Sequence, residues 1–334
     1  MKAFTLAIGV GAFVVGAGLS ASVAAQPIDR GCRDRTLVST GGPFPDNPQT
    51  LAIRWTGFSN FELAYRGEVL LLDAYFDRGA LFPPLGFKAG DISRAAGILI
   101  GHGHFDHMSD AASVATRTGA VVVGAPVTTE KLLAQSVDRS HVRTVTGKGG
   151  EELTIGRFKV RPILARHGEP PREVTAAFGQ ALQQTTPRPT AEQAAEAAAI
   201  RSRGTNDPRV IAEGTIAYLI TLDNGFRILY RDSGGVVTEF EKATMTQVGR
   251  VDVALLATAA SVLPALTAQQ AVEYVRTYKP DVYMPAHHDG SVNELWRATE
   301  PLFEAIKNED AGIITMSKVY REPACFDTTR RPRP

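Results

Sequence analysis

A cluster of metal-ligand side chains lies in the first half of the chain. Three of its seven histidines and one aspartate fall within six positions, in the run His102-Gly103-His104-Phe105-Asp106-His107. Imidazole nitrogens and a carboxylate are the ligand types that suit zinc and similar divalent ions. Side chains two positions apart in extended backbone point the same way, so His102 and His104 can bind one ion together. Asp106 and His107 follow at a turn and can bind a second ion beside it.

Residues further along the chain can complete both sites. His167 ends a predicted strand and is the candidate third ligand of the first ion. Asp232 follows another apolar strand, and its carboxylate can bridge two adjacent cations that would otherwise repel each other. The second ion still needs a histidine. His287 and His288 both qualify, and because adjacent residues at a strand end point to opposite sides, only one can bind easily. The spacing does not choose between them.

These additional ligands favour a two-ion site over a solvated polar loop or a lone structural zinc site. The remaining histidine, His141, lies in a polar stretch and is interpreted as a surface residue.

Short apolar strands must position these residues, since most of the candidates follow a predicted strand. The periodicity predicts strands at 51–55, 61–65, 69–73, 96–100, 120–124, 152–155, 158–164, 215–222, 226–230, 251–257 and 281–285. It predicts helices at 110–116, 128–135, 190–203, 267–278 and 291–306. The order is strand-rich and then helical, twice over, which indicates an α/β fold. Ligands that follow strand ends are expected at a sheet edge, where sites are usually built.

The periodicity of strands and helices stops between residues 169 and 214, a segment that several prolines interrupt. Only the helix at 190–203 is convincing there, with a capping box of Thr190 and Gln193 and a stop at Gly204. The segment is too poor in large apolar side chains to form its own core. We expect an insertion that forms a lid over the site.

The N-terminus has the pattern of a secretory signal peptide. Lys2 is followed by an uncharged apolar stretch and then by small residues near Ala25, which predicts a signal peptide at 1–25. An uncleaved membrane anchor is the alternative. Cleavage would leave a single domain at 26–334, periplasmic or secreted, without stable membrane insertion.

Two cysteines, Cys32 and Cys325, stand near the ends of this mature chain. In an exported protein they are free to pair, although the sequence alone leaves the pairing open.

The overall charge gives no sign of a polyanionic partner. The formal net charge is +1 with 21% charged residues, which excludes the strongly basic field typical of nucleic-acid binding. A small-molecule substrate is therefore expected, and the oligomeric state stays open.

The order of the ligands resembles the metallo-β-lactamase superfamily. Within it, Ile53-Arg54-Trp55-Thr56-Gly57 and Leu70-Leu71-Leu72-Asp73 resemble the L-ascorbate-6-phosphate lactonase-like branch. The resemblance implies an αββα sandwich of mixed sheets with outer helices and a dinuclear site at its edge. It selects His287, through Pro285-Ala286-His287, as the last ligand, and it implies that Asp73 supports the site from behind the ligands.

A complete set of ligands for two metal ions argues for a hydrolase that uses a metal-bridging hydroxide on a lactone, ester, amide or phosphodiester. With the signal peptide, the sequence predicts that this hydrolase is exported. Two divalent ions are expected, with zinc the default and manganese or iron possible. Asp106 is the expected catalytic residue, since it would orient the nucleophile. The alternatives are a metal-dependent oxidoreductase of the sulfur dioxygenase type, a β-lactamase, and a protein that keeps metal without turnover.

Overall fold

The protein is described by a computed structural model covering residues 29–168, 176, 188–258, 264–289 and 299–332. The predicted signal peptide at 1–25 lies outside the described residues. So do most of the stretch at 169–187 and the first part of the helix predicted at 291–306.

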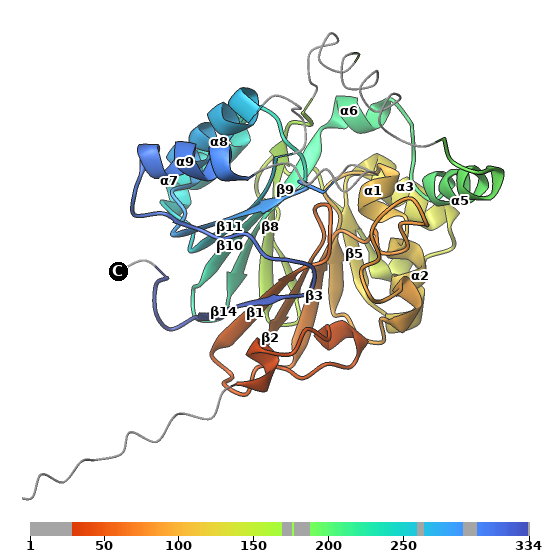
Figure 1. The fold of residues 1–334 in the computed structure, drawn as a ribbon, viewed down its shortest axis with the longest axis horizontal. Helices are drawn as coiled ribbons and strands as arrows, with labels where there is room; N and C mark the ends of the chain where they lie inside the picture. The colour runs from red at the N-terminus through yellow and green to blue at the C-terminus, as the bar shows by residue number, and fades with distance from the viewer. Residues whose placement is uncertain (1–28, 169–175, 177–187, 259–263, 290–298, 333–334) are drawn as a thin grey trace, which may run out of the picture.

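Two mixed sheets face each other, and helices cover their outer faces (Figure 1). The first sheet has the order β14-β1-β2-β3-β4-β5-β6 and the second β13-β12-β11-β10-β9-β8-β7. In each sheet, four strands pair antiparallel before three further strands add in parallel. The predicted αββα architecture is confirmed.

The first sheet consists of β1 (Thr50–Trp55), β2 (Phe61–Tyr65), β3 (Glu68–Leu72), β4 (Gly97–Leu99), β5 (Val121–Gly124), β6 (Val142–Thr144) and β14 (Pro323–Asp327). The second consists of β7 (Leu153–Ile155), β8 (Phe158–Ala165), β9 (Thr215–Leu222), β10 (Arg227–Arg231), β11 (Val253–Ala257), β12 (Val282–Ala286) and β13 (Ile314–Thr315).

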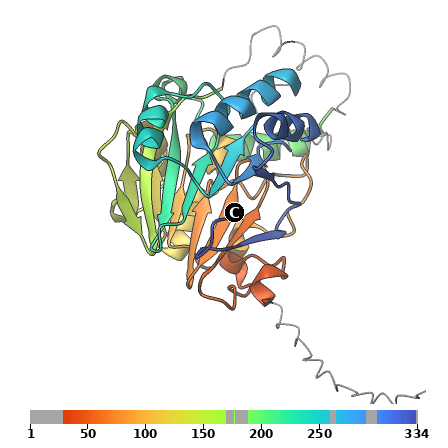
Figure 2. The same ribbon diagram turned by 90° about the vertical axis from the view of Figure 1, so that its left-hand side faces the viewer.

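The described helices are α1 (Phe105–Met108), α2 (Ala111–Thr118), α3 (Pro126–Ala134), α5 (Ala191–Ser202), α6 (Arg209–Glu213), α7 (Glu239–Val248), α8 (Pro264–Tyr278) and α9 (Glu300–Glu309). Helices α1 to α3 lie on the side of the first sheet. Helices α7 to α9 cover the second, with α8 and α9 side by side (Figures 1 and 2). Among the described residues, no helix has both the length and the apolar character needed to cross a membrane.

Strict alternation along the strands produces three apolar layers. In β2, Leu63 points into the core between the sheets, whereas Ala64 points to the outer face. Large rings such as Trp55, Phe158 and Tyr218 fill the central layer. The period of two therefore sends alternate residues to opposite sides of each sheet.

Most predicted elements are confirmed within a few residues, but two boundaries were wrong. The strand predicted at 69–73 ends at Leu72, because Asp73 adopts a left-handed φ of 55°. The start of the helix predicted at 267–278 is wrong, because α8 already begins at Pro264 and Thr267 lies inside it. Sequence periodicity also missed short elements such as β6, β13, β14, α1 and α6, which tertiary contacts stabilise. It missed the ten-residue helix α7 as well, although a capping box of Thr238 and Glu241 begins that helix.

A disulfide and buried hydrogen bonds attach the N-terminal segment to the first sheet. Cys32 is disulfide-bonded to Cys325 of β14. The Arg54 guanidinium, fully buried beside Glu62, donates to the carbonyl oxygen of Gly31. The two cysteines whose pairing the sequence left open are therefore joined in the structure.

Candidate metal centre

The seven predicted ligands gather where β4, β8, β10 and β12 end. They form three overlapping groups within which potential ligand atoms lie within 4.8 Å of one another. The groups are His102, His104 and His167; His102, His107 and Asp232; and Asp106, His107 and His287. Because His102 and His107 each belong to two groups, the arrangement is continuous, with Asp232 in the middle.

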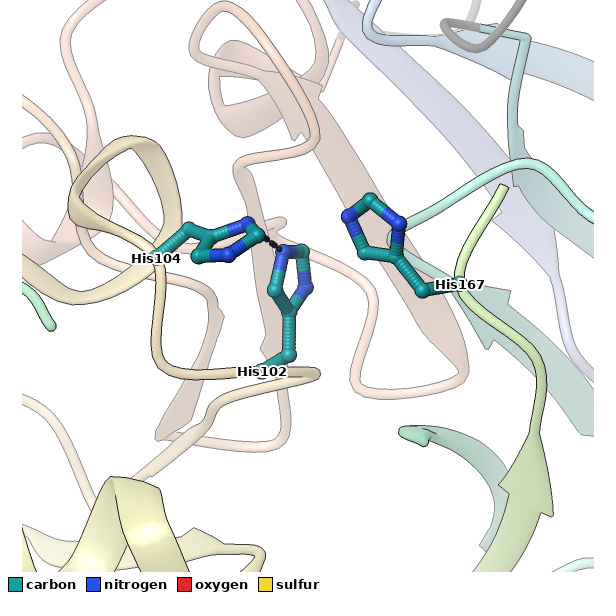
Figure 3. A group of neighbouring side chains, drawn as sticks. All are labelled: His102, His104 and His167. Carbon is teal, nitrogen blue, oxygen red and sulfur yellow. Dashed lines mark hydrogen bonds between the residues drawn. The ribbon is translucent and has the colours of Figure 1, made fainter. Parts of the chain in front are cut away.

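The first group brings together side chains from both sheets. His102 and His104 follow β4, and His167 follows β8 of the facing sheet (Figure 3). His102 Nε2 lies 2.9 Å from His104 Nδ1. The His167 ring centroid is 4.8 Å from that of His102 and 5.2 Å from that of His104. Three imidazoles therefore surround one point, as three-histidine sites require.

Asp232 lies between the two halves of the site. Its Oδ2 is 2.6 Å from His102 Nδ1 and 3.4 Å from His107 Nδ1, and the side chain is fully buried. The approach depends on Gly101, where an added Cβ would lie only 1.9 Å from the Asp232 Cγ. A glycine directly before the ligand run thus leaves room for the carboxylate.

The second half contains Asp106 and His107, both on α1, and His287 after β12. Asp106 Oδ2 lies 3.2 Å from His287 Nε2 and 3.6 Å from His107 Nε2. His288 instead stacks on Trp55 at a centroid distance of 4.2 Å. The geometry places His287 in the cluster and His288 outside it, a choice that spacing could not make.

The Asp73 carboxylate contacts Nδ1 of the His107 imidazole and so holds its orientation. Its Oδ2 lies 2.6 Å from His107 Nδ1, while Ser59 Oγ donates to the same oxygen at 2.6 Å. The other oxygen, Oδ1, accepts from the Gly101 amide at 3.0 Å. A carboxylate on Nδ1 leaves Nε2 of the imidazole for a metal, which is the usual arrangement behind a ligating histidine.

Burial and the neighbouring charges set the protonation states. Burial, helped by the neighbouring His102 imidazole, lowers the pKa of His104 to about 4 and of His167 to about 3. Both imidazoles are then neutral at physiological pH, as metal ligands must be.

The carboxylates and His107 behave differently. Burial raises the pKa of Asp106, but the His107 and His287 imidazoles outweigh it and hold that pKa well below its usual range. Burial lowers the pKa of His107, but the carboxylates of Asp106 and Asp73 outweigh it and raise the pKa to about 10. A metal that binds His107 must therefore displace a proton.

Several buried polar atoms of the cluster have no hydrogen-bond partner among the described residues. They are Asp232 Oδ1, His167 Nδ1 and His287 Nδ1. Buried polar atoms in folded proteins are normally paired, so each of these needs an explanation. Divalent ions fit the donor set of five imidazoles and two carboxylates. Binding them would offset the free-energy cost of burying this cluster of polar groups.

The described end of the insertion packs directly on the ligand run. The Thr205 amide donates to the Gly103 carbonyl at 2.8 Å. Arg203 donates to the Ser109 carbonyl at 3.0 Å. Ile200 is buried against Phe58 and Tyr75. Residues 200–205 thus contribute to the wall of the site.

Sequence reasoning missed Ser59 and Gly101. Ser59 carries no pattern of its own, since it lies in a turn between two strands. Gly101 had a usable signal, because a glycine between an apolar strand and a ligand run indicates close backbone approach. His141 is half-buried and lies outside all three groups.

Comparisons with known proteins agree with the observed fold. A family profile described as the β-lactamase superfamily domain matches residues 69–190. Igni18, a metallo hydrolase from Ignicoccus hospitalis, superposes with a TM-score of 0.57 at 15% identity, covering 83% of this chain and 98% of that one. This is the metallo-β-lactamase fold. The family profile matches only part of the chain, and the structural neighbour shows the fold alone.

Two further structures share the metallo-β-lactamase fold with this chain. YhfI from Bacillus subtilis has a TM-score of 0.50 at 11% identity, covering 83% of this chain and 98% of that one. CmlA, a diiron β-hydroxylase from Streptomyces venezuelae, has a TM-score of 0.51 at 14% identity, covering 84% and 55%. At such identities the likeness shows the fold alone.

Curated relatives match only part of the chain. A UPF0173 metal-dependent hydrolase of Cereibacter sphaeroides is 30% identical over 117 residues, which are 35% of this chain and 49% of the relative. One from Rhizobium etli is 32% identical over 118 residues, covering 35% and 48%. The chain spans about half the length of the curated relatives it matches. None of these names specifies the lactonase-like branch, which stays a prediction.

Proposed function

We propose that this chain is a dinuclear metal-dependent hydrolase of a small-molecule substrate. One observation carries the proposal: His102 and His107 each belong to two ligand groups, with the Asp232 carboxylate between them. Two ions bound side by side need a shared anion to offset their repulsion, and Asp232 is placed to supply it. The names of the partial relatives, metal-dependent hydrolases, support the same reaction class.

The residues would divide into two sites. His102, His104 and His167 would hold the first ion, and Asp106, His107 and His287 the second. When bound, such a pair supplies an activated water at neutral pH and a Lewis acid for a carbonyl or phosphoryl oxygen.

The side chains around this site would orient the attacking water and the ligand His107. Asp106 stays ionised and can accept a hydrogen bond from the attacking water, which orients it. Asp73 and Ser59 keep His107 in one orientation through its Nδ1. These roles make Asp106 the proposed catalytic residue and Asp73 a positioning residue.

The substrate proposal covers lactones, esters, amides and phosphodiesters. The lactone class rests on the resemblance of Ile53–Gly57 and Leu70–Asp73 to the lactonase-like branch. The described part of the insertion, with Ile200 on the rings of Phe58 and Tyr75, would form one wall of the substrate pocket. If deletion of residues 175–210 left metal content and substrate preference unchanged, the insertion would have no such role.

Metal analysis of the purified mature chain is the first test. About two zinc ions per chain are expected, with manganese or iron also compatible with the ligands. The same sample is then assayed on chromogenic lactone, ester, amide, phosphodiester and β-lactam substrates, before and after chelation. Hydrolysis that is lost on chelation and restored by the metal supports the proposal.

Controls make the result specific. His167→Ala should lower metal content and hydrolysis, whereas His141→Ala, outside every ligand group, should change neither. A wild-type chain that binds no divalent ion would refute the proposal. One iron per chain with oxygen consumption would favour the oxidoreductase alternative.

Export is also part of the proposal. It rests on the N-terminal sequence pattern, and the Cys32–Cys325 disulfide is consistent with an oxidising compartment. Cell fractionation with N-terminal sequencing tests it: periplasmic or secreted protein should begin at Gln26.

A further inference from the structure

Arg231 is fully buried at the end of β10, immediately before Asp232. Because adjacent strand residues point to opposite faces, Asp232 points into the metal centre and Arg231 points away from it. There it meets the helices over the second sheet, with Glu241 of α7 at 3.0 Å and the Tyr274 hydroxyl of α8 as partners. Tyr278 of α8 also donates to that Glu241 oxygen, at 2.5 Å.

The Arg231 guanidinium also donates to main-chain carbonyls on both sides of the site. Its Nη1 donates to Ser233 at 2.7 Å, and its Nη2 donates to Arg166 at 3.1 Å and to Val236 at 3.2 Å. Ser233 directly follows Asp232, and Arg166 directly precedes His167. One side chain therefore connects the ends of β8 and β10, from which two different ligands project.

The two strand ends are also in close contact with each other. The Gly168 amide donates to Ser233 Oγ at 3.3 Å. Gly235 adopts a φ of 135°, and a Cβ there would lie 2.4 Å from the Arg166 carbonyl oxygen. Tyr274 donates to the Gly235 carbonyl at 2.8 Å and so supports the same loop from the helix side.

We propose that Arg231 is a positioning residue that fixes His167 relative to Asp232 and thereby sets the metal affinity of the site. The inference rests on the proposed metal-dependent function. Arginine suits the role because its planar guanidinium carries five donors in a fixed arrangement, whereas lysine offers one compact ammonium group.

The chain offers a matched control in a second buried arginine–glutamate pair. Arg54 and Glu62 in the first sheet are both 0% exposed, as are Arg231 and Glu241 in the second. Arg54 donates to the carbonyls of Gly31 and Asp34 in the N-terminal segment. Loss of Arg54 should therefore perturb folding stability as loss of Arg231 does, but without moving a ligand.

The experiment compares Arg231→Met, Arg231→Lys and Arg54→Met in the full mature chain. Each protein is freed of metal and titrated with Zn²⁺ alone against a chromophoric chelator, and thermal unfolding of the metal-free form is recorded. We expect Arg231→Met to lose roughly 10- to 100-fold in zinc affinity, as is usual when the support of a ligand is removed. Arg231→Lys should recover part of that loss. Arg54→Met should lower the melting temperature and keep the zinc affinity of the wild type.

The visible absorption of the Co²⁺-loaded protein gives a second readout. The spectrum should change in Arg231→Met and stay unchanged in Arg54→Met, because only the first variant alters ligand geometry. If Arg231→Met does not fold, Tyr274→Phe is measured instead and should lower zinc affinity several-fold. Unchanged affinity and spectrum in the folded variant would overturn the inference, whereas failure of the wild type to bind zinc would refute the proposed function itself.

Discussion

At the scale of single residues, the candidate site depends on the absence of a side chain at one position as well as on its ligands. Gly101 contributes no side chain, and the Asp232 carboxylate occupies the space that a Cβ would take. Asp73 and His287 adopt left-handed backbone with φ of 55° and 58°. Such conformations are uncommon outside glycine and collect at functional sites, since the surrounding structure must hold them. Here they occur directly after β3 and β12, at two residues of the candidate site.

Gly101→Ala tests the need for that space. The added methyl group would displace Asp232, so we expect metal content to fall and activity to drop on the order of 100-fold, as small misplacements in active sites often cause. Gly90→Ala is the matched control, because a Cβ there meets nothing within 4 Å and its backbone is not left-handed. Metal analysis and kinetics check both variants, and normal metal content in Gly101→Ala would contradict the expectation.

The adjacent histidines allow an equally direct comparison. His287→Ala removes a group that faces Asp106, so the chain should retain about one ion instead of about two. His288→Ala removes a ring that stacks on Trp55 and should keep both ions. Elemental analysis after gel filtration measures the difference, and equal losses in the two variants would mean that the assignment of His287 is wrong.

At the scale of elements, ligands come from strand ends and from one short helix that other segments hold in place. Helix α1 spans only Phe105–Met108, too short to be stable by itself. Residues 200–205 of the insertion cover it through the Thr205–Gly103 hydrogen bond and through Arg203. The insertion is thus attached to the ligand run at the end that the structure describes.

Arg203→Ala should loosen this attachment. Arg203 also pairs with the Asp110 carboxylate at 3.1 Å, while its own side chain is 37% exposed. We expect a loss of roughly 0.5–1.5 kcal/mol in unfolding free energy and a several-fold decrease in activity at normal metal content. Arg209→Ala, which removes the ion pairs of an exposed arginine with Glu130 of α3 and with Asp207, should be almost neutral. Denaturant titration and kinetics on both variants decide the point.

At the scale of the whole molecule, the candidate metal ligands come from both sheets. His102, His104, Asp106 and His107 come from the first sheet's side, and His167, Asp232 and His287 follow strands of the second. Metal bound here would therefore stabilise the contact between the two halves.

Metal removal should accordingly lower the melting temperature. A ligand present at 1,000 times its dissociation constant stabilises the native state by about 4 kcal/mol. Differential scanning calorimetry with and without a chelator measures the shift, and re-addition of the metal should reverse it. An identical melting temperature in both conditions would argue against a metal held between the sheets.

The disulfide acts on the same scale, because it closes nearly the whole chain. Cys32 and Cys325 are separated by 293 positions, and a loop of that length gives a stabilisation on the order of 5 kcal/mol in the chain-entropy model. Cys32→Ser with Cys325→Ser should therefore unfold at lower denaturant concentration, with zinc content unchanged. The unreduced wild type should show no free thiol when denatured, and two titratable thiols would refute the bond.

Many strands, helices and candidate ligands could be predicted from the sequence, because the signals for them lie in residues that are close together in the chain. Periods of two and of 3.6 residues predicted most strands and helices. Residue type with spacing predicted the candidate ligands that gather in the structure, except for the choice between His287 and His288. The short elements α1, β6, β13 and β14 carried too little periodic signal, since packing stabilises them.

The sequence by itself determined which side chains can bind metal and which strands they follow, since ligand chemistry and strand period are local properties. Only the tertiary structure decided that His287 faces Asp106, that Gly101 makes room for Asp232 and that Arg231 connects the ends of β8 and β10. Those relations join residues up to 181 positions apart, as for Asp106 and His287. Only the packing of the two sheets brings such residues within hydrogen-bond distance.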